Sequence, residues 1–224
     1  KPRKTCQNTA NQRILGGIFI MIKILFICHG NICRSPMAEF ILKDMVRKQG
    51  ISEQFEIASA ATSTEEIWNG IGNPVYPPAR QELAKHGIDC SGKQATQLKK
   101  EDYDYYDYLI GMDTRNIRNI ESITGHKGGK ITMLLEYAGR KESISDPWYS
   151  SRFDITYQDV TEGCQALLEY LKKEKKIINK ETWKETQNLD VAEIKKISKI
   201  GRFGGTVFHG TANLVKEMIY LCSR

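Results

Sequence analysis

A cysteine and an arginine six positions apart mark the part of the sequence best suited to chemistry. Cys28 is followed by five residues, then by Arg34 and Ser35. A cysteine thiolate is a nucleophile, and a guanidinium can donate two parallel N–H bonds to a tetrahedral oxyanion, which lysine cannot match. Ser35 can donate its hydroxyl to the thiolate. The pattern therefore predicts a cysteine nucleophile beside a bound phosphate group.

The residues between the nucleophile and the arginine fit a phosphate-binding loop. The predicted phosphate-binding residues are His29, Gly30, Asn31, Ile32, Cys33, Arg34 and Ser35. Backbone N–H groups of a tight loop at a helix N-terminus form a cradle for an anion, helped by the helix dipole. Gly30 and Asn31 tolerate the left-handed backbone that such a loop needs. Cys28 would lie beneath the phosphorus, where the same positive field favours the thiolate.

The elements on either side of the loop are a strand and a helix. Residues 22–27 are a short, β-branched apolar run that ends at a Gly-Asn turn, as in a buried strand. Ser35 fits a helix N-cap and Pro36 the first helical position. Apolar residues then recur at helical spacing until Gly50. The loop is therefore expected directly after the first strand.

Strand and helix patterns alternate along the rest of the chain. Further strands are predicted at residues 55–58, 106–112 and 130–134, and further helices at 78–86, 114–120 and 155–173. This alternation predicts an α/β fold: a three-layer sandwich in which helices flank a four-stranded parallel sheet.

Charge is distributed unevenly over the 224 residues. The formal net charge is +6, yet residues 21–171 hold 17 basic and 21 acidic side chains, so the surplus lies in the two ends. We predict a catalytic domain at residues 21–173. Residues 1–20 are predicted to be a basic N-terminal extension that is disordered or not native. Residues 174–224 are predicted to be a basic C-terminal extension of unknown role with some helical periodicity.

Cysteine and histidine usage indicates the compartment and the absence of a metal. The six cysteines are scattered without a C-x-x-C pair, which favours reduced thiols in the cytoplasm over a disulfide scaffold. The four histidines have no metal-ligand spacing, so no metal is expected. The apolar run after the basic start is too short and too interrupted to span a membrane or to act as a secretory signal.

The sequence around the loop resembles the opening of the low-molecular-weight protein tyrosine phosphatase family. The resemblance is carried by residues 23–39, 59–63, 86–88, 107–110, 112–113 and 145–149, and it covers about residues 21–173. It implies a phosphotyrosine-containing protein as the substrate, with small aryl phosphates as further substrates. It also implies that Cys33 is the partner of Cys28 in a protective disulfide under oxidation.

Asp146 is the predicted general acid. In the family the acid precedes a proline and an aromatic residue, as in Asp146-Pro147-Trp148. The chemistry requires such a group, because the leaving oxygen must be protonated as Cys28 attacks phosphorus. Water, activated by the same carboxylate, then hydrolyses the cysteinyl phosphate without a cofactor. Trp148 and Tyr149 are the expected walls for the phenyl ring.

Two positions depart from the family pattern. Many members have a histidine that braces the loop asparagine where this chain has the segment 91–97, and Lys93 is the candidate replacement. The support of Asn31 is therefore an open point. Trp148 stands where tyrosine or phenylalanine is commoner, which predicts a bulkier wall for the leaving group.

Other functions remain as alternatives. An arsenate reductase has a similar loop but needs two further cysteines a few residues apart, and Cys90 has no such neighbour. A related protein-arginine phosphatase branch has threonine at the position of Ile32, so Ile32 favours phosphotyrosine. A non-catalytic phosphate-binding module could use the basic ends to contact nucleic acid, but these ends lack an RNA-binding motif. A weak homodimer is left open.

Overall fold

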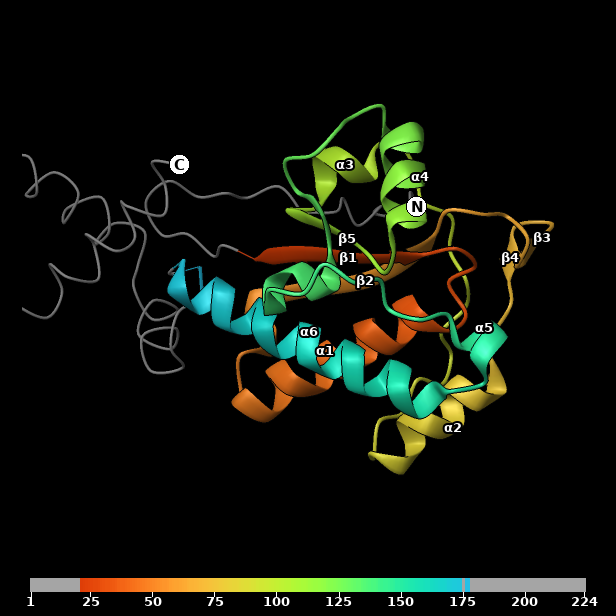
Figure 1. Ribbon diagram of the computed structural model, residues 1–224, viewed down its shortest axis with the longest axis horizontal. Coiled ribbons are helices and arrows are strands. Elements are labelled where there is room, and N and C mark those ends of the chain that lie inside the picture. The colour runs from red at the N-terminus through yellow and green to blue at the C-terminus, as the bar shows by residue number, and fades with distance from the viewer. Residues whose placement is uncertain (1–20, 175, 178–224) are drawn as a thin grey trace, which may run out of the picture. The chain divides into compact units, whose positions relative to one another are not determined.

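A sheet of four parallel strands organises the chain (Figure 1). The computed structural model describes residues 21–174, 176 and 177, and residues 21–174 form one compact unit. The sheet strands are β1 (Ile22–Cys28), β2 (Phe55–Ala61), β5 (Tyr108–Gly111) and β6 (Ile131–Met133), in the order β2-β1-β5-β6. The two predicted extensions lie outside the described residues, apart from 174, 176 and 177.

Helices cover both faces of the sheet. The helices are α1 (Arg34–Gln49), α2 (Pro77–Lys85), α3 (Asp102–Tyr105), α4 (Thr114–Thr124), α5 (Pro147–Ser150) and α6 (Phe153–Lys173), with short 3-10 turns η1 (Ser52–Gln54) and η2 (Leu134–Ala138). Helices α1 and α6 pack together on one face, while α4 packs against β5 and β6 on the other (Figure 1). The predicted three-layer α/β sandwich is confirmed.

Strand β1 is one of the two inner strands of the sheet. Its residues are almost all buried, as expected for a parallel strand with helices on both faces. Leu25 and Ile27 pack with Leu109 and Ile120 on the α4 side. Full burial of one such side chain contributes about 1.5–3 kcal/mol relative to exposure. A strand held this firmly gives a rigid support to the loop that follows it.

The end of α1 agrees with the sequence prediction, but its start does not. Gly50 ends the helix in the left-handed conformation at φ 66°, as a C-terminal glycine does. The helix begins at Arg34, with Cys33 rather than Ser35 at the N-cap position. The prediction of Ser35 as the N-cap was wrong, because its hydroxyl is bonded within the loop instead of to the helix.

Several short elements were not anticipated. A hairpin of β3 (Ile67–Trp68) and β4 (Ile71–Gly72) follows β2, and α5 begins directly after Asp146. Both lie at the end of the sheet where β1 enters its loop (Figure 1). The strand predicted at 106–112 is shorter, at Tyr108–Gly111. No helix among the described residues is long and apolar enough to cross a membrane.

Candidate active site

Cys28 ends β1 and begins a loop of residues 28–35, here called the nucleophile loop. Its sulfur is buried with the side chain only 3% exposed, and Sγ lies 3.0 Å from Oγ of Ser35. The Ser35 oxygen also accepts a 2.8 Å hydrogen bond from the Asn31 amide. The Ser35 proton is therefore available to the sulfur, which stabilises a negative charge on it.

Asn31 holds the middle of the nucleophile loop. It has a left-handed backbone with φ 57°, as the sequence predicted, and is 1% exposed. Its Nδ2 donates to Oγ of Ser35 and to Oγ of Ser59, each at 2.8 Å, and its Oδ1 accepts from the Thr96 N–H at 3.0 Å. Every polar atom of this buried side chain is thus bonded, which fixes the loop.

Behind Asn31 lies a buried charged pair of Glu39 and Lys93. The Ser59 hydroxyl donates to Glu39 at 2.5 Å. Lys93 Nζ lies 3.4 Å from the same carboxylate oxygen and donates to the Ser59 carbonyl at 3.1 Å. Lys93 therefore supports Asn31 indirectly, through Ser59 and Glu39.

Gly30 and His29 differ in part from their expected roles. Gly30 is not left-handed; a Cβ there would instead lie 2.9 Å from Cγ of Glu66. Its lack of a side chain thus permits a close approach, not an unusual backbone. The His29 ring lies at the surface, 2.9 Å from the Glu65 carboxylate. Only its backbone remains available to the loop.

Arg34 joins the loop to two carboxylates. Its Nη1 donates to Asp113 at 2.6 Å and to the Ile144 carbonyl at 3.2 Å, and its Nη2 donates to Asp146 at 2.6 Å. Arginine has five N–H groups in a fixed plane, and the contacts above leave its Nε–H and one N–H of Nη2 available to a ligand. This remaining pair can bind oxygens of a phosphate held over Cys28.

The neighbouring Cys28 and Asp146 raise the pKa of both Arg34 and Cys33, which keeps the arginine charged and the Cys33 thiol uncharged. Burial alone lowers the pKa of Arg34, but the neighbouring Cys28, Asp146 and Asp113 outweigh it and raise that pKa above its usual value. The guanidinium is therefore permanently charged. Burial, and next the nearby Cys28 and Asp146, strongly raise the pKa of the Cys33 thiol. Cys33 is consequently an uncharged thiol, although it lies within the same loop.

Asp146 begins α5 and faces the nucleophile loop. One carboxylate oxygen accepts the Trp148 N–H at 3.1 Å and so caps α5, while the other contacts Arg34. Trp148 is 55% exposed and packs on Tyr76, with ring centroids 5.1 Å apart. Tyr149 is 86% exposed. Residues 145–149 are here called the acid loop. This loop directs one Asp146 oxygen to Arg34 and exposes two aromatic rings, those of Trp148 and Tyr149.

Three supporting residues were missed by sequence reasoning. Asp113 caps α4 by accepting the Asn116 N–H and also holds Arg34. Its signal was an aspartate directly before a helical pattern. Glu39 and Tyr76 had no such signal, since a glutamate within a helix and a tyrosine before two prolines are usually surface residues.

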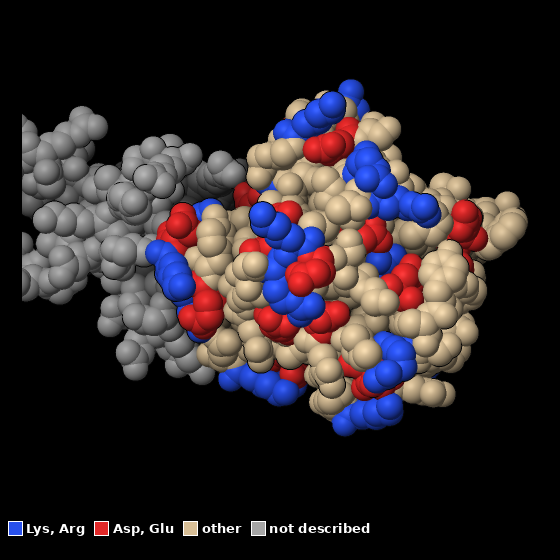
Figure 2. Space-filling model, in the orientation of Figure 1, with Lys and Arg blue, Asp and Glu red and all other residues tan. Residues whose placement is uncertain are grey.

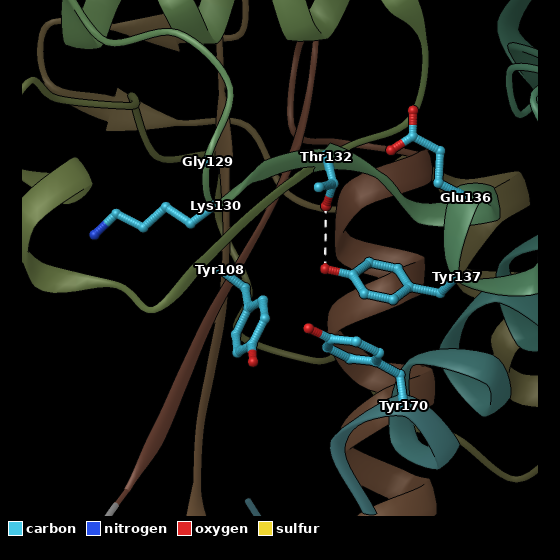
Figure 3. Close-up of a pocket in the computed structure, with 7 residues that line it drawn as sticks. All are labelled: Tyr108, Gly129, Lys130, Thr132, Glu136, Tyr137 and Tyr170. Atoms are coloured by element: carbon cyan, nitrogen blue, oxygen red, sulfur yellow. Dashed lines mark hydrogen bonds between the residues drawn. The ribbon is translucent and has the colours of Figure 1, made fainter. Parts of the chain in front are cut away.

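A cavity lies at the end of the sheet opposite Cys28. Its volume is about 310 Å³. It is lined by Gly129 and Lys130, which come directly before the start of β6, whereas Cys28 lies at the end of the parallel strand β1. Tyr108, Tyr137 and Tyr170 surround it, with the hydroxyls of Thr132 and Tyr137 3.1 Å apart (Figure 3). It holds none of the predicted site residues. Within residues 21–174, 176 and 177, no three His, Cys, Asp or Glu side chains are grouped as a metal site.

Comparison with known proteins agrees with this geometry. A family model described as low molecular weight phosphotyrosine protein phosphatase matches residues 23–177. The protein "Low molecular weight protein-tyrosine-phosphatase YfkJ" of Bacillus subtilis is 38% identical over 160 residues, 70% of this chain and 100% of the relative. Its crystal structure is similar, with a TM-score of 0.65 and 37% identity over 69% of this chain and 97% of that one.

A Drosophila protein of the same fold has a different printed activity. The crystal structure of DARP, "drosophila arginine phosphatase", has a TM-score of 0.60 and 31% identity, covering 67% of this chain and 98% of that one. The present chain belongs to the low-molecular-weight protein tyrosine phosphatase family, and it is an enzyme that hydrolyses phosphate esters. The family resemblance inferred from the sequence is confirmed.

Proposed function

We propose that this enzyme removes phosphate from phosphotyrosine in proteins, and from small aryl phosphates, through a cysteinyl-phosphate intermediate. The observation that carries the proposal is the position of Arg34, which contacts Asp146 at 2.6 Å from the same loop in which Cys28 is bonded to Ser35. Nucleophile, anion-binding group and acid therefore meet at one place. The names of the relatives support the same substrate class.

In the first step the Cys28 sulfur attacks phosphorus. An S–P bond forms, the P–O bond to the phenol breaks, and its electron pair goes to the phenolic oxygen. Asp146 donates its proton to that oxygen, which would otherwise leave as an unstable anion. Arg34 and the backbone N–H groups of the nucleophile loop stabilise the charge on the transferring phosphoryl group.

In the second step water attacks the phosphorus of the cysteinyl phosphate. Asp146, now a carboxylate, accepts a proton from the water as the O–P bond forms. The P–S bond breaks, inorganic phosphate leaves, and the sulfur returns to a thiolate beside Ser35. Asp146 ends the cycle protonated again, so the two steps balance.

The exposed rings offer a surface on which an aryl leaving group can pack. Trp148 and Tyr149 present apolar surface beside Asp146, where a phenyl ring could pack. Similarity to the arginine phosphatase makes phosphoarginine the second candidate. Comparing kcat/KM for one peptide carrying phosphotyrosine or phosphoarginine separates them. Phosphotyrosine is expected to be the better substrate, and a higher value for phosphoarginine would reassign the enzyme.

The direct test is release of p-nitrophenol from p-nitrophenyl phosphate. Cys28→Ser in the full chain is expected to lower turnover by at least about 10⁴-fold, because the weaker nucleophile remains in an intact loop. Cys90→Ala is the matched control, since Cys90 is a buried thiol outside the loop. Circular dichroism verifies the fold of both variants. Full activity in Cys28→Ser would refute the mechanism.

The domain assignment is also a proposal. Residues 21–173 would carry all of the activity, leaving the basic extensions without a catalytic role. A chain trimmed to these residues should hydrolyse p-nitrophenyl phosphate at the rate of the full chain. A large loss would assign the extensions to the catalytic unit.

A further inference from the structure

Two arginines lie side by side on the exposed face of α4. Arg115 and Arg118 are exposed and three positions apart, which places them next to each other on the helix surface. The face drawn in Figure 2 has Lys and Arg side chains over α4. They form a local basic patch on a catalytic body that is otherwise slightly acidic.

The structure fixes this helix to the active site at two points. Asp113, the N-cap of α4, contacts Arg34 at 2.6 Å. Six residues further along, Asn119 lies within 3.4 Å of the Thr62 hydroxyl, and the Thr62 N–H donates to the Cys28 carbonyl at 2.9 Å. Arg115 and Arg118 lie on the helix between these two anchors. Because helical side chains lean toward the helix N-terminus, theirs lean toward the end of α4 at which Asp113 contacts Arg34.

Neither arginine has an ion-pair or hydrogen-bond partner within the described part of the chain. Glu121 is the single acidic residue of α4, and its carboxylate accepts the Gly128 N–H at 3.1 Å. By contrast, Arg140 is bonded to Asp159 and Glu162. Two neighbouring positive charges without a counter-ion repel each other, so an anion bound there would relieve the repulsion.

The part of the loop next to the β3–β4 hairpin has acidic neighbours. Glu65 contacts His29 at the surface, and Glu66 packs against Gly30 at the start of the β3–β4 hairpin. An acidic group is therefore repelled on the hairpin side and attracted on the α4 side. Such an arrangement selects the position of a charge as well as its sign.

We propose that Arg115 and Arg118 bind an acidic side chain of the protein substrate, one that lies within a few residues of the phosphotyrosine. This inference rests on the proposed phosphotyrosine activity. An extended peptide advances about 3.3–3.6 Å per residue, so a side chain two positions from the phosphotyrosine lies about 7 Å away along the chain. Arginine suits a carboxylate because it can donate two parallel N–H bonds. The subsite would set substrate preference without touching the reacting atoms.

The test uses three phosphotyrosine peptides of equal length whose flanking residues are glutamate, glutamine or lysine. With the full-length enzyme, kcat/KM is expected to be about three- to tenfold higher for the glutamate peptide than for the glutamine peptide at low salt, and less at high salt. The double variant Arg115→Glu/Arg118→Glu should reverse the order and favour the lysine peptide. Its turnover of p-nitrophenyl phosphate should stay unchanged, because that substrate has no flanking residues.

Lys172→Glu/Lys173→Glu is the matched control, since it makes the same change in net charge at the end of α6. An unchanged peptide preference in Arg115→Glu/Arg118→Glu would overturn the inference, as would an equal change in the control. RNA binding lost in the α4 variant with peptide preference intact would assign the patch to nucleic acid and also overturn it. Failure of the wild-type enzyme on every phosphotyrosine peptide would instead refute the proposed function.

Discussion

The nucleophile loop and the acid loop are built in opposite ways, although they meet at Arg34. The nucleophile loop is buried apart from His29 and Gly30, and its Asn31 is bonded to Ser35 and to Ser59, which Glu39 and Lys93 hold from behind. The acid loop fixes Asp146 by a helix cap and by Arg34, while Trp148 and Tyr149 extend into solvent.

This difference separates chemistry from recognition. Stabilising charge on a phosphoryl group requires donors that are already in place, and a buried, fully bonded loop provides them. Accepting a tyrosine side chain of a protein requires an open, apolar surface, which the exposed rings provide. Substitutions in the first region should therefore change kcat, and those at the rim should change KM.

After Cys28→Ser, the largest effect is expected from Asp146→Asn. Loss of the proton donor should lower kcat for p-nitrophenyl phosphate by about 10²–10⁴-fold, the usual contribution of a general acid. Aryl phosphates with a more acidic phenol need less protonation and should lose less. An equal loss for all leaving groups in a series of kcat/KM values, which report the first step, would show that Asp146 acts only by holding Arg34.

Arg34→Lys should have the next largest effect. One removed donor in an oxyanion site typically costs about 10²–10³-fold in kcat, and lysine cannot reproduce the planar contacts to Asp113, Asp146 and a phosphate together. Binding of inorganic phosphate, measured as competitive inhibition, should weaken in parallel. Undiminished phosphate inhibition would place the anion elsewhere.

Substitution of Lys93, which lies behind the nucleophile loop, is expected to change kcat about tenfold. Lys93→Ala removes one of the two lysines that contact the buried Glu39, the one on the side of Ser59, so the bonds through Ser59 to Asn31 loosen, and kcat should fall about tenfold. Lys93→Arg keeps the charge and should restore part of the rate. Lys48→Ala is the control, because it breaks an exposed pair with Asp44. Wild-type turnover in Lys93→Ala would mean that Asn31 does not depend on the pair.

A smaller effect is expected at the rim. Trp148→Ala should raise KM for aryl phosphates a few-fold with little change in kcat, since a ring stacked on an aromatic contributes about 0.5–1.5 kcal/mol beyond its buried area. Steady-state kinetics with aryl and alkyl phosphates measure the difference. Unchanged aryl-phosphate kinetics would remove Trp148 from the substrate wall.

The smallest effect is expected at Cys33. Burial and the nearby Cys28 raise the pKa of its thiol, so this group stays protonated below that raised pKa and carries no charge between about pH 5 and 9. Cys33→Ala should therefore keep the pH profile of kcat/KM, with rates within about twofold of wild type. A displaced limb of the profile would show that Cys33 titrates with the site.

The sequence was sufficient for the features that depend on local pattern. The apolar run of residues 22–27, the loop that follows it and the alternation of strands and helices predicted the parallel sheet and the position of Cys28. Asn31 was recognised because few residues other than glycine adopt a left-handed backbone easily. Asp146 was predicted as the general acid because the resemblance places the family's acid before a proline and an aromatic residue.

The remaining features depend on contacts between distant segments. Glu39, Ser59 and Lys93 meet only because α1, β2 and the segment after α2 converge behind the loop, and no local pattern encodes that contact. The start of α1 was misplaced for the same reason, since the Ser35 hydroxyl is engaged by Asn31 and Cys28 rather than by its own helix.

The measurement that tests the central claim most directly is capture of the phosphoenzyme. Wild-type enzyme is mixed with a phosphotyrosine peptide, quenched in acid within the first turnover, digested and examined by mass spectrometry. The account predicts the mass of one phosphoryl group on the peptide that contains Cys28, and none in Cys28→Ser. A phosphoryl group on another residue, or product formed at full rate by Cys28→Ser, would contradict it.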